Sequence, residues 1–460
     1  MRADDVAPAA PSRQLTLFDT TSIIVGIIIG SSVYVTAPMI AKNVPSTFSF
    51  LAVWLMGGAF ALVGSLCYAE LATALPADGG DYIFLSRAYG RPVGFLFAWC
   101  ELWLVRPGAI GSLAYVFAEY ADQLVPLGRH APVIYAAGVT ALITAANLLG
   151  VMTGKWLQNV LTLAKVLGLL AVIVVGFSVT APAVEAGAGP ASEPLSGAET
   201  NWGLAMIFIL YAYGGWNDMA FVGAEVSDPD KNILRALVLG TAAVTGIYLL
   251  INASFLHALG LDGVRGASAL AADVVGLRWG STGAKAVSLL VAVSALGAVN
   301  GMTFTAARIY YALGTRHRLF APLGVWSSRF DGPIRALVLQ GVITLGLVIS
   351  VGWSAEGKAK EGFTSMANFT MPPFWFFLLL VALAVIVLRW REPNLPRPYR
   401  TVAFPLLPLI FGAGAAYMLW SSYLYARDKF APQAYWTFAA LGAGVVACVI
   451  DRLLGPSANE

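Results

Sequence analysis

An interrupted apolar segment near the start of this sequence carries residue types that could bind a small anion. The apolar run 23–29 is followed by Gly30, Ser31 and Ser32, and an apolar segment then resumes as far as Ile40. The run covers only about a third of a bilayer, so these residues would lie at membrane depth, where polar groups are expensive unless they face a polar cavity. A half-helix beginning near Ser32 would offer free N–H groups and the positive end of its dipole to a carboxylate.

A second interruption, Tyr-Gly-Gly-Trp at residues 213–216, divides a later apolar segment. Adjacent glycines destabilise a helix and leave backbone groups unpaired, which hydrocarbon tolerates only where those groups line a cavity or are buried in protein. Carbonyl groups from Tyr211 to Gly214 could receive an ammonium group. A solute with one carboxylate and one amine fits both interruptions, which describes an α-amino acid. The alternative is that both are packing kinks, because glycine is common in membrane helices.

A lysine deep in an apolar segment is the third candidate functional group. Lys165 shares one helical face with Lys155, Gln158 and Thr162. It lies roughly 15 Å by helical rise from the preceding loop, too far to reach the membrane interface easily. A lysine at mid-helix costs roughly 3 kcal/mol on insertion, so we expect Lys165 to face the bundle as a fixed cation, where a sodium ion could otherwise bridge helices. Small and polar residues between 294 and 308 are a candidate partner face.

The composition places these segments in an all-α polytopic membrane protein. Of 460 residues, 58% are hydrophobic and 12% charged, and the mean hydropathy is +0.75, which is too apolar for a soluble protein of this length. We expect about twelve membrane-spanning helices, at residues 16–40, 48–75, 91–120, 131–150, 157–180, 201–226, 236–260, 281–313, 333–353, 364–390, 402–426 and 432–453. The two interrupted spans are the first and the sixth. This spacing predicts two inverted repeats of five helices each.

The predicted organisation is one transmembrane domain over 15–453, between a disordered tail at 1–14 and a short tail at 454–460. Repeat one is expected at about 15–180, repeat two at about 201–390 and two further helices at about 402–453. Most Lys and Arg residues fall on the side of the N-terminus, so we expect both termini in the cytoplasm and a multi-pass protein of the cell (inner) membrane.

Several function classes find no support in the sequence. The net charge of +3 comes without a basic tract that would suggest nucleic acid. Cys67, Cys100 and Cys448 lie in apolar runs without metal-ligand spacing, and no nucleophile–base arrangement is present. We therefore expect no cofactor, no metal site and no enzymatic activity.

Further motifs resemble the L-type amino acid transporter family of the amino acid–polyamine–organocation superfamily over nearly the whole chain. They are Gly26-Ile-Ile-Ile-Gly30-Ser31-Ser32, Pro76-Ala-Asp-Gly-Gly-Asp-Tyr82, Arg106-Pro107, Tyr211-Ala-Tyr-Gly-Gly-Trp-Asn217, Ala224-Glu225 with Asp228-Pro229, and Leu388-Arg-Trp-Arg-Glu-Pro393 through Tyr399. The resemblance implies a LeuT-like fold with ten core helices in two inverted repeats, helices one and six broken, and two more helices at the end.

The resemblance also implies roles for the residues at the two interruptions. Gly30, Ser31 and Ser32 would bind the substrate carboxylate, and Ile28, Tyr211 and Gly214 would offer carbonyls to the amine. Tyr211 would form an aromatic gate, Trp216 belongs to the same substrate-binding motif, and Lys165 would replace the sodium ion of sodium-coupled relatives.

One departure from the family pattern and two further observations limit the substrates and partners that we expect. Ser32 stands where the family has a glycine, which favours small substrates. Residues 213–216 hold no carboxylate and Asp218 is expected on one helical face with Glu225, so neutral rather than dibasic substrates are predicted. Eukaryotic L-type members pair with a glycoprotein through a cysteine between spans three and four; residues 121–131 contain none, so we expect no disulfide-linked heavy chain.

These observations together predict a sodium-independent transporter of neutral L-amino acids that works by alternating access, as an exchanger. A proton-coupled uptake permease, with Lys165 losing and regaining a proton, is the nearest alternative. A transporter-like amino acid sensor is an alternative from another class.

Overall fold

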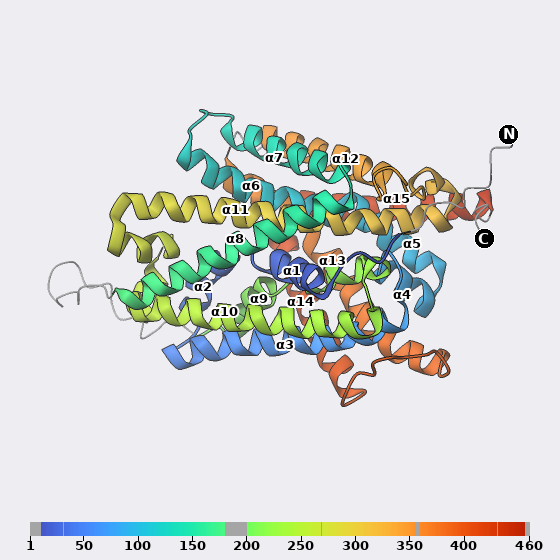
Figure 1. Ribbon diagram of the computed structural model, residues 1–460, viewed down its shortest axis with the longest axis horizontal. Helices are drawn as coiled ribbons and strands as arrows, with labels where there is room; N and C mark the ends of the chain where they lie inside the picture. Colours follow the sequence, from blue (N-terminus) through green and yellow to red (C-terminus); the bar gives the residue numbers. More distant parts are fainter. Residues whose placement is uncertain are drawn as a thin grey trace.

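The computed structural model of this protein describes residues 11–30, 32–179, 200–267, 269–354, 358–429 and 431–455. Within these ranges the chain forms helices joined by loops, with three isolated β-bridges and no β-strand. The long helices run along the longest axis of the molecule and pack side by side (Figure 1). The predicted all-α polytopic fold is confirmed.

The helices of the first half begin with a short pair, α1 and α2, and continue with longer elements. Their bounds are α1 Leu17–Ile28, α2 Ser32–Lys42, α3 Thr47–Ala74, α4 Asp81–Tyr89, α5 Arg91–Cys100, the π-helix η1 Glu101–Val105, α6 Arg106–Leu124, α7 Ala131–Leu148 and α8 Val151–Ser178. The segment α5–η1–α6 forms one span of 34 residues. A π-helical turn inside such a span often marks a functional position.

The second half also begins with a short helix. Its elements are α9 Trp202–Ala212, the 3₁₀ turns η2 Trp216–Phe221 and η3 Gly223–Glu225, α10 Pro229–Gly266, α11 Leu270–Arg316, the 3₁₀ turn η4 Arg318–Leu323, α12 Ile334–Ser354, α13 Ala359–Arg391, α14 Leu406–Lys429 and α15 Ala431–Leu454. The described helices α10 and α11 continue past kinks at Gly260 and Gly280, which both have positive φ.

Ten described helical segments are long and apolar enough to cross a membrane, and the bent pair α1–α2 brings the number to eleven. The two helices of this pair meet at an angle of 49°. The sixth predicted span is the remaining one: its helix α9 has only 11 residues and gives way to 3₁₀ turns. The predicted breaks in the first and sixth spans are therefore present.

Local backbone chemistry explains where the second break falls. Gly215 has φ +108°, a left-handed conformation that side chains other than glycine adopt with strain. A Cβ there would lie 2.6 Å from Cγ2 of Ile27, so the backbone of the second break approaches α1 directly. Helix α9 consequently ends at Ala212, and the chain re-enters helical geometry only as 3₁₀ turns.

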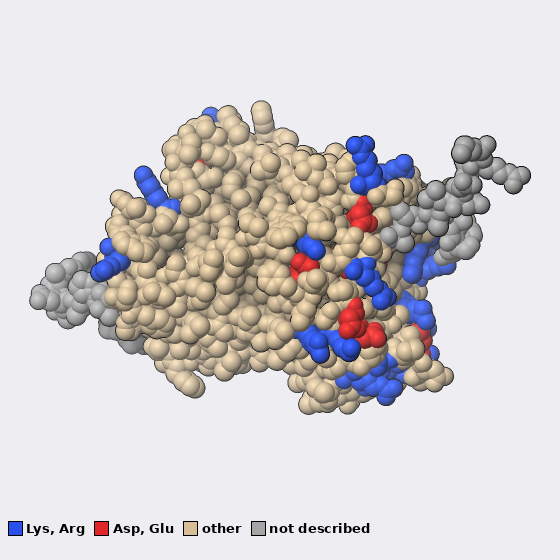
Figure 2. Space-filling view, in the orientation of Figure 1, with Lys and Arg blue, Asp and Glu red and all other residues tan. Residues whose placement is uncertain are grey.

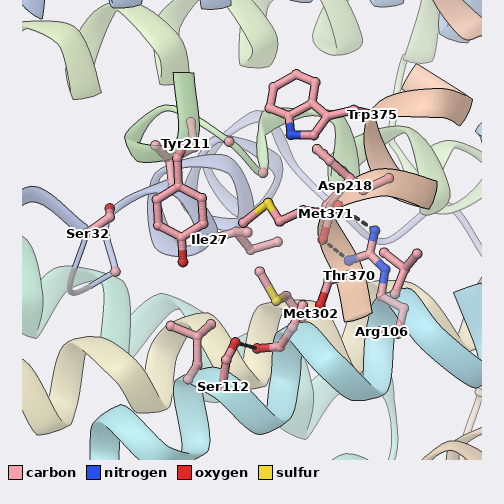
Figure 3. Close-up of a pocket in the computed structure, with 18 of the residues that line it drawn as sticks. Ile27, Ser32, Arg106, Ser112, Tyr211, Asp218, Met302, Thr370, Met371 and Trp375 are labelled. Carbon is pink, nitrogen blue, oxygen red and sulfur yellow. Dashed lines mark hydrogen bonds and ion pairs between the residues drawn. The ribbon is translucent and has the colours of Figure 1, made fainter. Parts of the chain in front are cut away.

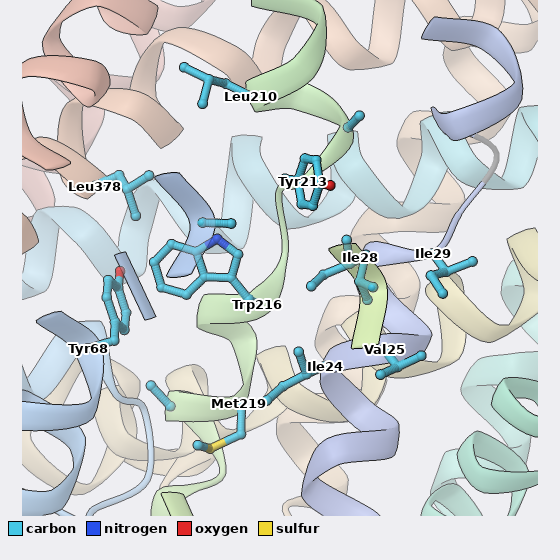
Figure 4. Close-up of a cluster of buried hydrophobic side chains, with 14 of the residues drawn as sticks. Ile24, Val25, Ile28, Ile29, Tyr68, Leu210, Tyr213, Trp216, Met219 and Leu378 are labelled. Carbon is cyan, nitrogen blue, oxygen red and sulfur yellow. The ribbon is translucent and has the colours of Figure 1, made fainter. Parts of the chain in front are cut away.

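The two broken segments lie at the centre of the bundle rather than at its edge. Helix α1 packs against α8, α10 and α11 and against η2. Figure 4 shows apolar side chains from both breaks gathered in one buried cluster, with Ile28 and Ile29 on the first segment and Tyr213 and Trp216 on the second. The surrounding long helices hold two irregular backbone stretches away from lipid, as membrane proteins require.

The two described ends of the chain lie at the same end of the molecule (Figure 1). Ser12 Oγ donates to Asp331 Oδ2 at 2.8 Å, and Arg318 donates to the carbonyl of Leu454 at 2.7 Å. Lys and Arg side chains concentrate toward that end (Figure 2). Residues 1–10 and 456–460 of the two predicted tails lie outside the described residues.

Candidate substrate-binding site

A cavity of about 140 Å³ lies between the two breaks (Figure 3). Five of the predicted substrate-binding residues line it: Ile28, Gly30, Ser32, Tyr211 and Gly214. Ser31 lies outside the described residues. Ser32 and Ala212 are 180 positions apart in sequence, so the fold brings the two predicted half-sites together around one space.

The backbone carbonyls at the first break already accept hydrogen bonds from other groups of the protein. Ile28 O accepts from the N–H of Gly30 at 2.8 Å and from the hydroxyl of Tyr248 at 3.0 Å. Ser294 Oγ donates to Ile29 O at 3.1 Å. The Ile28 carbonyl thus already accepts two hydrogen bonds, and a substrate amine that binds it would replace the Gly30 N–H or the Tyr248 hydroxyl. Ser32, whose Oγ is 3.5 Å from Ala212 O, begins α2 and presents that helix's N-terminus to the cavity.

Tyr248 of α10 connects the two breaks, and no motif in the sequence pointed to this residue. Its hydroxyl lies 3.0 Å from Ile28 O and 3.3 Å from Ala212 O, so the carbonyls at the ends of both half-helices share one hydrogen-bond donor. Tyr213, next to the second break, packs against its ring with centroids 5.1 Å apart. A motion of one broken helix relative to the other would change both hydrogen bonds.

Lys165 is fully buried and its ammonium group bridges α1 and α11. The Nζ atom donates to the carbonyls of Gly26 at 2.7 Å, Ile29 at 2.8 Å and Ser294 at 2.9 Å. Two of these carbonyls come from the end of α1, where the break leaves them without helical donors. Among the described residues no carboxylate forms an ion pair with Lys165. The ammonium group therefore occupies a site built of carbonyl oxygens, which are the ligands that a hard cation takes in proteins.

The face of α8 that carries Lys155, Gln158, Thr162 and Lys165 packs against α1, as predicted. Lys155 Nζ lies 3.3 Å from a carboxylate oxygen of Asp19, and Thr162 donates to the carbonyl of Ser22 at 3.1 Å. Gln158 lies so close to Gly26 that a Cβ there would be 2.1 Å from its Nε2. The helical-face prediction is confirmed, and the predicted contact between Lys165 and the face around Ser294 is present.

The expectation for Asp218 was wrong. Its side chain does not share a face with Glu225 but lines the cavity and pairs with Arg106, through Nη1 at 2.5 Å and Nη2 at 2.8 Å. Glu101 holds the same guanidinium at 2.6 Å from Nε. The reason is the backbone: Asp218 lies in a 3₁₀ turn rather than an α-helix, so helical periodicity did not apply. Glu225 pairs instead with Arg308, 2.7 Å away.

Trp216 does not line this cavity. It borders a smaller hollow of about 20 Å³ beside it, and its ring packs edge-on against Tyr68 with centroids 4.9 Å apart. A Cβ at Gly64 would lie 2.4 Å from the Trp216 ring, so the indole is closely held. Trp216 therefore packs against the second break on the side away from the main cavity and does not contact that cavity.

One wall of the cavity carried no signal in the sequence. Helix α13 contributes Thr370, Met371, Phe374 and Trp375, and α11 contributes Met302. The apolar members look like ordinary lipid-facing residues when read along the chain. Pro372 and Pro373 inside α13 are the one feature that could have pointed there, since proline frees backbone groups and bends a helix.

Comparisons with known proteins show which family the sequence belongs to. The sequence matches the family described as "Amino acid permease" over residues 15–447. It is 30% identical to the Homo sapiens "b(0,+)-type amino acid transporter 1" over 403 residues, which cover 86% of this chain and 80% of that protein. It is 29% identical to the Homo sapiens "Large neutral amino acids transporter small subunit 2" over 421 residues, covering 90% and 77%. The resemblance to L-type transporters is confirmed, and the chain belongs to the amino acid permease family of the amino acid–polyamine–organocation superfamily, as a membrane transporter and not an enzyme.

Proposed function

We propose that this protein exchanges small neutral L-amino acids across the cell membrane by alternating access, without sodium. The observation that carries the proposal is the position of Lys165. Its Nζ lies within 2.9 Å of three carbonyl oxygens, those of Gly26, Ile29 and Ser294, which are ligands of the kind that a sodium ion would take. A lysine side chain there, fixed to the chain, takes the place of an exchangeable ion.

The lining of the cavity supports an amino acid as the substrate. The N-terminus of α2 at Ser32 suits a carboxylate, and the carbonyls around Tyr211 and Gly214 suit an ammonium group. The relatives are named as amino acid transporters, one of them for large neutral amino acids. Here the Ser32 side chain, which lines the cavity where the family has a glycine, favours the smaller neutral members.

Purified protein in proteoliposomes tests the proposal. Vesicles loaded with a labelled neutral amino acid should release it faster when an unlabelled one is added outside, and replacing sodium with choline should leave the rate unchanged. A strict requirement for sodium would overturn the coupling assignment. Substrate-induced thermal stabilisation without any flux would favour an amino acid sensor.

Proton-coupled uptake is the second candidate, and the environment of Lys165 is the observation that favours it. Among the described residues, the side-chain amine that could carry the proton donates only to neutral carbonyls. An imposed pH gradient separates the two functions: it should drive net uptake into empty vesicles under proton coupling and have no such effect on an obligate exchanger.

Two further features of the assembly are part of the proposal. We place both termini in the cytoplasm, because Lys and Arg concentrate at that end of the molecule (Figure 2). We also propose that the chain works without a disulfide-linked partner, since Cys67, Cys100 and Cys448 are all buried. Labelling an added N-terminal epitope with an impermeant reagent, in intact and in permeabilised cells, tests the first. Migration of the purified protein with and without reductant tests the second.

A further inference from the structure

The end of the cavity away from the two breaks carries polar groups that the proposed binding of the amino acid backbone does not use. Figure 3 shows Ser32 and Tyr211 on one side of the cavity and Arg106, Asp218, Thr370 and Trp375 on the other. A substrate held by its carboxylate and amine at the breaks would direct its side chain toward this second group. Each of these four side chains is at least nine-tenths buried.

Trp375 supplies a hydrogen-bond donor that has no partner. The indole is 3% exposed, and its Nε1 forms no hydrogen bond. In Figure 3 the nitrogen edge of the ring faces the interior of the cavity. A buried N–H without an acceptor is unfavourable, and an indole can only donate. A substrate side chain that satisfies it must therefore carry an acceptor atom, which excludes both hydrocarbon and ammonium side chains.

Asp218 supplies the acceptor at the same end. Its Oδ1 takes one N–H of Arg106 at 2.8 Å and retains capacity for a second donor, whereas Oδ2 takes the other N–H at 2.5 Å and the hydroxyl of Thr305 at 3.4 Å. An uncharged N–H or O–H can use that capacity. A second cation would have to lie beside the Arg106 guanidinium, and this like-charge repulsion is strong in a buried site. The hydroxyl of Thr370 donates to Met366 O at 2.8 Å and can accept as well.

From this arrangement we infer that the side-chain end of the cavity recognises an uncharged group that both accepts and donates hydrogen bonds, the carboxamide of asparagine or glutamine. The amide oxygen would accept from Trp375 Nε1, and the amide nitrogen would donate to the Asp218 carboxylate. The inference rests on the proposed function and names the substrate class within it. A site that hydrogen-bonds its substrate rejects an analogue lacking those groups, because its own buried polar atoms then stay unpaired.

Pairs of amino acids with matched shapes provide the test. Asparagine and leucine have the same branching, and glutamine and methionine have the same length, so the members of each pair are close in size and differ mainly in their polar atoms. Purified protein should bind each amide about tenfold more tightly than its apolar match, measured by competition against labelled asparagine. Lysine should compete less well than glutamine.

Trp375→Phe keeps the aromatic ring and removes the N–H. It should lower the asparagine-to-leucine affinity ratio from about tenfold toward one. The control is Trp390→Phe on the same helix, whose side chain is 77% exposed, and its ratio should match the wild type. If the Trp375 variant does not fold, the wild-type ratios still decide.

The possible outcomes separate this inference from the proposed function. Equal binding of asparagine and leucine to the wild type, or tighter binding of lysine than of glutamine, would overturn the carboxamide assignment while leaving amino acid transport in place. A ratio that Trp375→Phe does not change would remove the role of the indole. Absence of binding by any amino acid would instead overturn the proposed function itself.

Discussion

Arg106 and Asp218, which are 112 positions apart in the sequence, form a two-point ion pair in the wall of the central cavity, with nitrogen–oxygen distances of 2.5 and 2.8 Å. The pair joins α6, immediately after its π-helical turn, to the 3₁₀ turn of the broken sixth span. Glu101 contacts the same guanidinium from the other side at 2.6 Å. The second break is thereby attached to an intact helix next to the proposed substrate.

Asp218→Ala should destabilise the protein strongly. It leaves the guanidinium of Arg106 buried with Glu101 as its one remaining ion-pair partner among the described residues, and removing one member of a buried pair costs about 3 kcal/mol or more of unfolding free energy. Thermal unfolding in detergent measures the effect. Asp262→Ala is the matched control, because Asp262 is 93% exposed and pairs with Arg265 at the surface, where an ion pair contributes about 1 kcal/mol or less. Equal melting temperatures for the two variants would contradict this account.

Lys165→Ala should reduce exchange on the order of 100-fold, because the carbonyls of Gly26, Ile29 and Ser294 lose their shared donor and the end of α1 is no longer positioned. Labelled amino acid efflux from proteoliposomes measures the loss, with protein amount checked in each preparation. Lys285→Ala, an exposed lysine of α11, should exchange like the wild type. Near-normal flux in the Lys165 variant would remove the fixed-cation argument.

The parts of the site that could be predicted from sequence are those where a residue type conflicts with its surroundings. Glycine and serine in an apolar run indicated where the first break lies. Lys165, in the middle of a span, indicated a polar contact inside the bundle, which the structure shows with Ser294. Helical periodicity then placed Lys155, Gln158 and Thr162 toward α1, because α8 is a regular helix.

The parts that could not be predicted depend on irregular backbone or on distant pairing. Asp218 and Glu225 share a face only if the segment is α-helical, and it forms 3₁₀ turns instead. The partnership of Arg106 with Asp218 requires knowing which helices meet. Trp375 looks like any aromatic residue in an apolar span, since only the packing of α13 against the cavity reveals its unpaired N–H.

Gly30→Ala should block substrate binding without damaging the fold. A Cβ at Gly30 meets only Leu113 Cδ2, at 3.8 Å, so the added methyl group extends into the cavity where the carboxylate is proposed to bind. Stabilisation by saturating substrate, about 2.7 kcal/mol at one hundred times Kd, should disappear. Gly138→Ala on α7, where a Cβ meets nothing within 4 Å, is the control and should keep the full substrate-induced shift. An undiminished shift in the Gly30 variant would show that the carboxylate binds elsewhere.

Asp78 should make the protein less stable as pH rises. It lies in the loop between α3 and α4, 7% exposed, and one of its carboxylate oxygens has no hydrogen-bond partner. Burial, and then the negative charge of Glu225, raise the pKa of Asp78 well above its usual 3.8, although Arg308 opposes the shift. The unfolded chain loses this proton near the usual value. The stabilising contribution of Asp78 is therefore complete below about pH 4 and is lost as pH rises toward the folded pKa.

Asp78→Asn puts a permanently neutral group of the same shape in this position and should remove that part of the pH dependence. Melting temperatures of wild type and variant, measured from about pH 5 to about pH 8, should diverge as pH increases, with the variant the more stable at the upper end. Asp262→Asn, at an exposed position, should follow the wild-type curve. Parallel curves for wild type and the Asp78 variant would mean that Asp78 is ionised in the folded protein, and Arg308 would then have to balance both Asp78 and Glu225.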